Sequence, residues 1–372
     1  MSQEFEIFIV TLPGLEKYLF QEVQEAGFRG ARAIGGGVIV QGGWRDVWRA
    51  NLVLRGASKV LARIGEFRAM HLAQLDKRSR KFPWGDFLLP GHKIKVEVTT
   101  NRKSKIYHAG AAIERIERAI HEEFGAEIAT SMDDADILIK ARIDSNLVIF
   151  SIDTSGMALH KRGHKQAMGK APLRETIAAM TLRACDYDGS EPVLDPMCGS
   201  GTYVIEAAEI ARNLLAGRAR HFAFERLVSY DRTAVEAMKA NWQTSDTAQH
   251  FYGSDRNDAV IGFATENAKR AGVADLCTFA QKPFSDITPP DGPPGLVMIN
   301  PPYGNRIGNK KQLFALYQSF GDVMRERFTG WRVGMITTDR QLADATKLPW
   351  LPPGAPIAHG GLKVRLFRTE AI

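Results

Sequence analysis

Cysteine is scarce in this chain, and long apolar runs are missing. Only 3 of the 372 residues are cysteines, and the spacing of Cys185, Cys198 and Cys277 matches neither a disulfide framework nor a zinc site. We therefore expect buried, unpaired thiols, no bound metal and a reducing, cytoplasmic environment. No stretch of about 18 or more apolar residues occurs, so no membrane span is expected. The first residues, MSQEFEIFIV, mix acidic and apolar side chains, which is typical of a strand rather than of a signal peptide.

Positive charge is unevenly distributed along the chain. The formal net charge of +7 is by itself weak support for a nucleic-acid partner. Residues 55–105, however, contain 13 Lys and Arg against 4 Asp and Glu, a local excess of nine positive charges. An excess of this size predicts a surface that faces phosphates, with an ordinary solvated face as the alternative.

The first 160 residues show short strand and helix patterns that predict two α+β domains. In 1–66, apolar strand segments flank helical patterns at 15–26 and 44–54. In 67–160, a helix and a strand precede the cationic connection NRKSKIYH, which leads into a helical pattern at 111–124 and then two strands spaced like a hairpin.

From residue 161 onward, apolar strand segments alternate with long helical patterns. The strands are expected at PVLDP, HFYGSD, CTFAQ, LVMINPP and RVGMITT, and the helices at 172–186, 202–215, 232–243, 257–271 and 311–328. This alternation predicts a Rossmann-like α/β domain with a mostly parallel sheet, whose ligands bind beyond the carboxyl ends of the strands.

The segment VLDPMCGSGTYVIEAA (193–208) places an acidic strand end before a glycine loop and a helix. Gly199 and Gly201 allow the backbone to approach a ligand without a Cβ, and Thr202 begins a helix whose first amides are free. A P-loop requires a Lys before this Thr, and the dinucleotide fingerprint requires a different glycine spacing. Neither is present, so the loop suits a cationic, zwitterionic ligand better than a pyrophosphate.

A second acidic residue ends the next strand, in HFYGSDRN. Asp255 can accept hydrogen bonds from the two hydroxyl groups of a ribose. Acidic residues are common at strand ends in α/β proteins. Asp255 supports a ribose site because it lies one strand after the glycine loop.

The segment LVMINPPYGNRIG (296–308) runs an apolar strand into Asn300, Pro301, Pro302 and Tyr303. The prolines fix φ and lack amide donors, which leaves rigidly held carbonyl acceptors. Asn300 adds a side-chain acceptor, and Tyr303 adds an aromatic face for stacking. Such a set can accept hydrogen bonds from an exocyclic base amine and orient its nitrogen toward an electrophilic methyl group, so that catalysis rests on positioning and electrostatics. The structural alternative is a rigid turn that ends a strand.

With these motifs, the chain resembles the class I methyltransferases, and more closely the THUMP-containing guanine-N2 RNA methyltransferases of bacteria and archaea. GGGVIVQG and WRANLVLRGASKVLARIGEF resemble the ferredoxin-like first domain of that family, and NRKSKIYHAGAAIERIERAI resembles its THUMP signature. KRGHKQAMGKAPLRETIAA (161–179) resembles the family's linker. The resemblance covers nearly the whole chain. It implies a ferredoxin-like domain over 1–66, an RNA-binding THUMP domain over 67–160 and a seven-stranded class I methyltransferase domain over 161–372.

The resemblance also implies S-adenosyl-L-methionine (SAM) as methyl donor, S-adenosyl-L-homocysteine (SAH) as product, and no metal. The residues implied around the methionine part of the donor are Asp195, Pro196, Met197, Gly199, Gly201 and Thr202. The residues implied at the donor ribose are Asp255, Arg256 and Asn257, and those at the target base are Asn300, Pro301, Pro302 and Tyr303.

One position departs from the family pattern. Relatives carry Asp after the third strand, near the donor adenine, where this chain has Pro283 in AQKPFSDI. Phe284 is expected to stack on the adenine instead, with Asp286 as the alternative. In the linker, Arg162, Gly163, Lys165 and Arg174 either contact phosphate or are ordinary surface charges.

The family, rather than the residues, implies guanine N2 in structured RNA, with 23S rRNA favoured over tRNA. An adenine-N6 DNA methyltransferase uses the same amine chemistry, but the two N-terminal domains and the lack of a recognisable helix-turn-helix argue against it. A non-enzymatic RNA-binding protein with a vestigial donor pocket is the third alternative, and the intact glycines and Asn-Pro-Pro-Tyr segment count against it.

Overall fold

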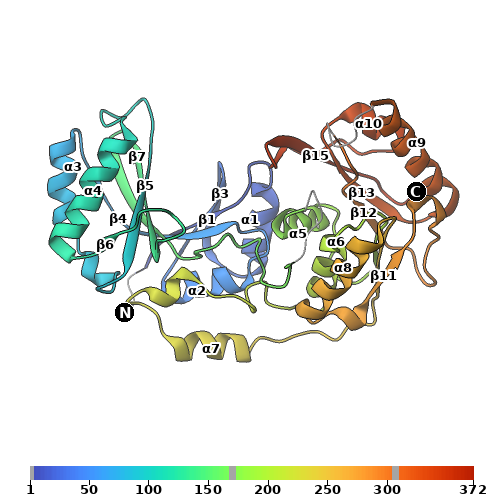
Figure 1. The fold of residues 1–372 in the computed structure, drawn as a ribbon, viewed down its shortest axis with the longest axis horizontal. Helices are drawn as coiled ribbons and strands as arrows, with labels where there is room; N and C mark the ends of the chain where they lie inside the picture. Colours follow the sequence, from blue (N-terminus) through green and yellow to red (C-terminus); the bar gives the residue numbers. More distant parts are fainter. Residues whose placement is uncertain (1–3, 167–172, 304–309) are drawn as a thin grey trace. The chain divides into compact units, whose positions relative to one another are not determined.

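The computed structural model describes residues 4–166, 173–303 and 310–372. The chain forms two compact units, each with one β-sheet (Figure 1). The first unit contains the chain up to Val10, Val23–Leu159 and Arg220–Asn241, and the second contains Thr11–Glu22, His160–Ala219 and Trp242–Ile372. None of the helices in the described ranges is long and apolar enough to cross a bilayer.

A single eight-stranded sheet runs through the first unit, in the order β2-β3-β1-β4-β8-β7-β5-β6. Its strands are β1 (Phe5–Val10), β2 (Arg29–Ile34), β3 (Gly37–Gly42), β4 (Lys59–Arg68), β5 (Lys93–Thr100), β6 (Glu127–Ile128), β7 (Ile137–Asp144) and β8 (Leu147–Asp153). The expected hairpin is present as the antiparallel pair β7–β8. β4 pairs antiparallel with β8, so the strands of 1–66 and those of 67–160 share one sheet. Strands β2 and β6 were not predicted, because neither shows an alternation of apolar side chains.

Five α-helices accompany the strands in this part of the chain. They are α1 (Glu16–Glu25), which passes from the second unit to the first, α2 (Trp44–Val53), α3 (Leu72–Arg80), α4 (Ala109–Phe124) and α7 (Arg232–Ala240). Two short 3-10 helices are η1 (Trp84–Asp86) and η2 (Ala223–Arg226). α4 buries Ile116 and Ile120 and ends where Gly125 adopts a φ of 78°, a conformation that favours glycine.

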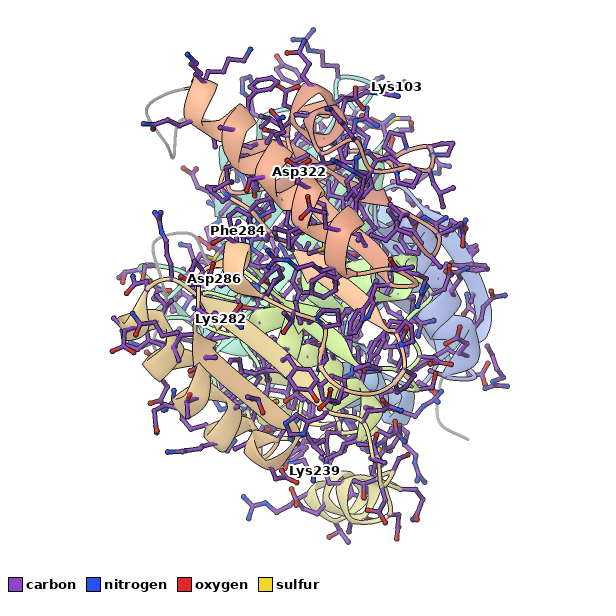
Figure 2. The ribbon with its side chains drawn as sticks, turned by 90° about the vertical axis from the view of Figure 1, so that its right-hand side faces the viewer. Lys103, Lys239, Lys282, Phe284, Asp286 and Asp322 are labelled. Carbon is purple, nitrogen blue, oxygen red and sulfur yellow. The ribbon has the colours of Figure 1, made fainter. Side chains whose placement is uncertain are left out.

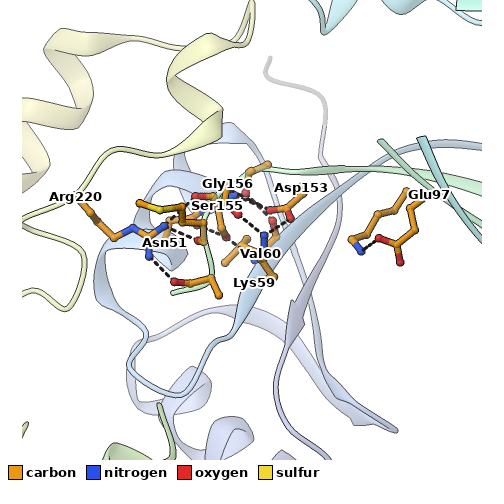
Figure 3. Close-up of polar contacts among 12 residues, drawn as sticks. Asn51, Lys59, Val60, Glu97, Asp153, Ser155, Gly156 and Arg220 are labelled. Carbon is orange, nitrogen blue, oxygen red and sulfur yellow. Dashed lines mark hydrogen bonds and ion pairs between the residues drawn. The ribbon is translucent and has the colours of Figure 1, made fainter. Parts of the chain in front are cut away.

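Buried polar contacts tie α2 to the residues that follow β8 (Figure 3). Asn51 Nδ2 donates to Thr154 Oγ1 at 3.0 Å, and Ser155 Oγ donates to Asn51 Oδ1 at 2.6 Å. Arg220 donates to the Ser155 carbonyl at 3.1 Å. These contacts satisfy polar groups that would otherwise be costly to bury, and they attach the returning segment Arg220–Asn241 to the first unit.

The second unit contains the expected Rossmann-like sheet, with seven strands in the order β11-β10-β9-β12-β13-β15-β14. The strands are β9 (Val193–Asp195), β10 (Phe251–Asp255), β11 (Cys277–Gln281), β12 (Leu296–Ile299), β13 (Arg332–Thr337), β14 (Ile357–His359) and β15 (Leu362–Arg368). The first five in sheet order are parallel, whereas β15 and β14 are antiparallel. The mostly parallel fold is therefore confirmed. The chain proceeds from β9 to β10 and β11 on one side and returns with β12 on the other, so β9 and β12 flank the switch point where ligands bind in such sheets.

The second unit contains α5 (Glu175–Ala184), α6 (Thr202–Ala211), α8 (Asp258–Ala271), α9 (Lys310–Arg327) and α10 (Arg340–Ala345), with the 3-10 helices η3 (Ala274–Leu276) and η4 (Phe284–Asp286). The first four match predicted helices with differences at the ends, whereas α10 was not predicted. The helix predicted at 232–243 is α7, which lies in the first unit. α6 stops at Ala211 rather than at 215, and Asn213 beyond it has a φ of 50°. β15 was missed although Val364 and Leu366 alternate with polar residues.

Candidate active site

The carboxyl ends of three neighbouring strands bring the predicted site residues to one edge of the second sheet. β9 lies between β10 and β12, and the register pairs Asp195 with Gly253 and Leu194 with Val297. Asp195, Asp255 and Asn300 each end or follow one of these strands. The structure therefore brings the two acidic residues and the Asn-Pro-Pro-Tyr segment to the edge at which parallel sheets bind ligands.

The loop after β9 is held in a fixed conformation by backbone hydrogen bonds. The Met197 N–H donates to Asp195 Oδ1 at 3.0 Å, and the Cys198 N–H donates to the Ser254 carbonyl at 2.9 Å. Pro196 stands between the strand end and this turn. The donor loop, which we define as residues 195–202, is thereby attached both to its own strand and to β10.

The two glycines of the donor loop are needed for different reasons. Gly201 has a φ of 83°, and a Cβ there would lie 3.1 Å from Ala264 and from the Phe279 ring. Gly199 has a φ of 51°, but a Cβ there would meet no described atom within 4 Å. Gly201 thus allows close packing of the loop, whereas Gly199 lies beside open space into which a ligand can extend.

Asp255 joins the donor loop to the start of α8. Its Oδ2 accepts the Gly199 N–H at 3.2 Å, and its Oδ1 accepts the Asn257 N–H at 3.0 Å. Asn257 in turn caps α8 by accepting the Ala259 N–H at 3.1 Å. Arg256 between them is exposed. Each carboxylate oxygen of Asp255 retains acceptor capacity for a ligand hydroxyl.

The pKa of Asp195 is unusually high for an aspartate side chain. Burial raises its pKa to about 8, the neighbouring Asp255 also raises the pKa, and the Met197 N–H opposes the shift. A buried carboxylate of this kind is stabilised by a nearby positive charge. The electrostatics of the donor loop therefore favour a cationic ligand.

β12 delivers the Asn-Pro-Pro-Tyr segment from the core of the sheet. All four residues of the strand are fully buried, so the position of Asn300 is closely fixed by packing. The Asn300 Oδ1 atom is itself buried, and no donor in the described parts of the chain bonds to it. A buried acceptor in this state costs free energy that a donor on a ligand can recover.

A contact that the sequence did not indicate supports this segment. The Tyr317 hydroxyl, on α9, donates to the Pro302 carbonyl at 3.3 Å and lies 3.1 Å from Thr337 Oγ1 at the end of β13. Tyr317 is almost fully buried. The Pro302 carbonyl thus already accepts a hydrogen bond from the protein. The Pro301 carbonyl accepts none among the described residues. A lone Tyr within an amphipathic helix gives no sequence signal for this role.

Tyr303 is completely buried in this conformation. The expected stacking of its ring on a base would require the ring to become exposed, and that role stays a prediction. Gly304, the next residue of the motif, lies outside the described residues.

Phe284 follows β11, where the resemblance placed the adenine contact. Its ring is half-buried and lies edge-on to Phe320, 6.3 Å between centroids. Lys282, Phe284 and Asp286 are labelled in Figure 2, and Asp286 is exposed. Stacking on adenine through the free part of the Phe284 ring stays a prediction.

The linker before α5 contacts the donor loop. The expectation for Arg162 in this linker is wrong. Arg162 is buried and pairs with the buried Glu206 of α6 at 3.1 Å, so it is neither a surface charge nor available to phosphate. Lys165 Nζ donates to Thr202 Oγ1 at 2.8 Å and pairs with Glu175 at 3.3 Å. Lys165 therefore positions the first residue of α6. Residues 167–172 of the linker motif lie outside the described residues.

Comparisons with known proteins identify relatives for both parts of the chain. The family described as "RMKL-like, methyltransferase domain" matches residues 162–349, and "RlmL ferredoxin-like domain" matches residues 6–61. A ribosomal RNA large subunit methyltransferase K/L from Vibrio cholerae is 32% identical over 352 residues, which are 91% of this chain and 49% of the relative. The chain thus spans about half the length of the curated relatives that it matches.

Solved structures resemble the whole chain. One from Listeria monocytogenes, described as a predicted N6-adenine-specific DNA methylase, is 27% identical with a TM-score of 0.87 and covers 100% of this chain and 97% of its own. A protein described as a methyltransferase and solved in complex with SAH is 25% identical with a TM-score of 0.87, covering 100% of this chain and 99% of its own. These findings confirm the family resemblance and the ferredoxin-like character of the first segment.

Proposed function

This chain belongs to the family of RMKL-like methyltransferase domains, and from that premise we propose that it transfers a methyl group from SAM to the N2 amine of a guanine in structured RNA. The observation that carries the proposal is the buried Asn300 Oδ1, an acceptor without a donor in the described residues, at the sheet edge that also holds Asp195. The Asn300 acceptor suits an amine, and the acidic Asp195 at the same edge of the sheet suits a sulfonium.

The donor loop fits SAM in its chemistry. SAM supplies a methyl group activated by a sulfonium, and its ammonium group adds a second positive charge. The buried carboxylate of Asp195 complements positive charge, and Gly199 leaves open space beside it. Asp255 offers acceptors for two ribose hydroxyls. A structure related to the whole chain contains SAH, which supports the same ligand here.

The base site would act by holding and orienting the amine. Asn300 Oδ1 and the Pro301 carbonyl accept hydrogen bonds from its two N–H groups, which directs the nitrogen lone pair toward the methyl carbon. The new N–C bond forms as the C–S bond breaks, and the electron pair of that bond remains on sulfur. The alkylated nitrogen then loses a proton to solvent. Positioning and electrostatics suffice for this step, because no strong base has to remove a proton first.

The choice of guanine N2 and of ribosomal RNA rests on relatives. The Vibrio cholerae relative is named for the large ribosomal RNA, and 23S rRNA is accordingly the substrate that we propose ahead of tRNA. Because the chain spans about half of that relative, its substrate needs a direct test. The description of the Listeria monocytogenes structure favours adenine N6 in DNA as a second candidate, and the amine chemistry is common to both.

The test is nucleoside mass spectrometry of rRNA, tRNA and DNA from a strain lacking this chain, with the purified chain then added to the unmodified nucleic acid. We expect N2-methylguanosine to be missing from 23S rRNA and to be restored by the chain and SAM. Loss of N6-methyladenine from DNA would replace the proposal with the second candidate. An unchanged set of methylated nucleosides, together with no transfer by the purified chain, would overturn both.

Removing the Asp255 carboxylate should weaken donor binding. We expect Asp255→Ala to lose about 1–3 kcal/mol of SAM binding free energy, the scale of a lost hydrogen-bonded charged partner. Asp258→Ala is the matched control, because it removes an exposed carboxylate three positions along the chain. Calorimetry of SAH binding measures both. Equal affinity in the two variants would remove Asp255 from the donor site.

A further inference from the structure

We propose that residues 101–108 form a preformed binding loop for a single-stranded stretch of RNA, in which a base stacks on Tyr107 and phosphates contact Lys103 and Lys105. We call this segment the basic loop; it connects β5 to α4 in the first unit (Figure 1). The inference rests on the proposed RNA substrate and adds where the first unit holds it.

Exposed and buried residues alternate along the basic loop. Ser104 and Ile106 are each 4% exposed, whereas Lys103, Lys105 and Tyr107 are exposed. Lys103 is labelled near the top of Figure 2. The two anchors point inward, so the cations and the aromatic ring are presented together to solvent.

Hydrogen bonds hold the basic loop in this conformation. Ser104 Oγ donates to Asn101 Oδ1 at 3.0 Å, and Asn101 Nδ2 donates to Asp144 at 2.6 Å. The Lys105 N–H donates to Asn146 Oδ1 at 2.9 Å, in the turn between β7 and β8. At the far end, Thr100 Oγ1 donates to the Ile106 carbonyl at 2.6 Å. A loop fixed in this way loses little conformational entropy when it binds.

The cations of the basic loop differ from those cations of the wider basic stretch that carboxylates neutralise. Of the 13 Lys and Arg between 55 and 105, the following are paired with carboxylates: Lys59, Arg63, Arg80, Lys93 and Lys95. Among the ion pairs of the described residues, none involves Arg102, Lys103 or Lys105. The phosphate-facing surface expected over all of 55–105 is therefore narrower. Lys77 and Lys81, on and after α3, also take part in no ion pair among the described residues, and the basic loop differs from them because it adds an exposed aromatic ring.

Tyr107 gives the basic loop a feature that a simple phosphate site lacks. Its side chain is 62% exposed, and its ring lies 4.3 Å from that of His108. A ring beside cations is the arrangement that binds unstacked bases. A base in a duplex is already stacked, so the loop favours single-stranded segments over helical ones.

The test measures binding of the full chain to a short labelled single-stranded oligoribonucleotide and to the duplex of the same sequence. We expect Tyr107→Ala to weaken binding of the single strand about tenfold, because stacking of one base contributes on that scale. Tyr107→Phe keeps the ring and should bind like the wild type. Duplex binding should change little in either variant.

The charge contribution is tested by Lys103→Glu with Lys105→Glu. This double variant should bind the single strand more weakly, and the slope of log affinity against log salt should flatten by about 1.4, or 0.7 for each phosphate lost. Lys77→Glu with Lys81→Glu on and after α3 makes the same charge change at exposed positions and serves as the control. An equal effect in both double variants would overturn the assignment to the basic loop.

Two further outcomes decide between this inference and the proposed function. Unchanged binding in Tyr107→Ala, or equal losses for single strand and duplex, would overturn the stacking role even if methyl transfer is normal. If RNA binding depends on Tyr107 as expected but the wild-type chain transfers no methyl group, the basic loop is upheld and the enzymatic proposal is overturned. Binding of an acidic peptide in preference to the oligoribonucleotide would replace RNA with a protein partner.

Discussion

Asn300→Ala is expected to lower the rate of methyl transfer by roughly 10²–10³-fold while leaving SAM affinity nearly unchanged, the scale found when one positioned hydrogen-bonding group is removed from an active site. The buried Asn300 Oδ1 has no donor among the described residues, so little of the fold depends on its bonding. Removal of the Asn300 side chain should therefore impair the positioning of the substrate amine and leave the donor loop intact.

The measurement combines single-turnover methyl transfer with calorimetry of SAH binding to the same preparation. Asn300→Asp is the informative companion, because it keeps an acceptor oxygen at the same position and loses the amide donor. We expect Asn300→Asp to retain more activity than Asn300→Ala. Transfer at the wild-type rate by Asn300→Ala would contradict the proposed role, and loss of SAH binding would mean that the residue supports the donor site instead.

The parts of the site that sequence could predict are those whose chemistry lies within a few consecutive residues. Asp195 and the glycines after it form one loop, and Asn300 with its two prolines forms one corner. Each motif is readable because local backbone conformation and ligand contact are set by neighbours in the chain. The alternation of strands and helices then places both motifs at the same sheet edge.

The parts that sequence could not predict are contacts between distant residues of common types. Tyr317 bonds to the Pro302 carbonyl from 15 positions away, and Lys165 bonds to Thr202 from 37 positions away. Local counting of charge failed for the same reason. Arg63 and Arg80 belong to the basic stretch, but carboxylates elsewhere in the chain neutralise them. Only the three-dimensional arrangement separates paired from unpaired charge.

Donor affinity should depend strongly on pH, because Asp195 has a pKa of about 8 before the donor binds. A cationic donor stabilises the carboxylate form, so binding below that pH requires the loss of one proton. SAH affinity is unsuited to this test because SAH lacks the sulfonium charge. SAM affinity should fall about tenfold for each pH unit below the pKa.

Asp195→Asn separates this effect from titration of the donor itself, whose α-amino group also ionises near pH 8. The variant has no proton to lose at this position, so its SAM affinity should be weaker at pH 8 and nearly independent of pH between 6 and 7.5, roughly the range in which the donor's amine stays charged. Calorimetry in two buffers with different ionisation enthalpies should show release of up to one proton by the wild type and less by the variant. Identical pH profiles would mean that the buried carboxylate does not face the positive charge of the donor, and the orientation proposed for SAM over the donor loop would have to be abandoned.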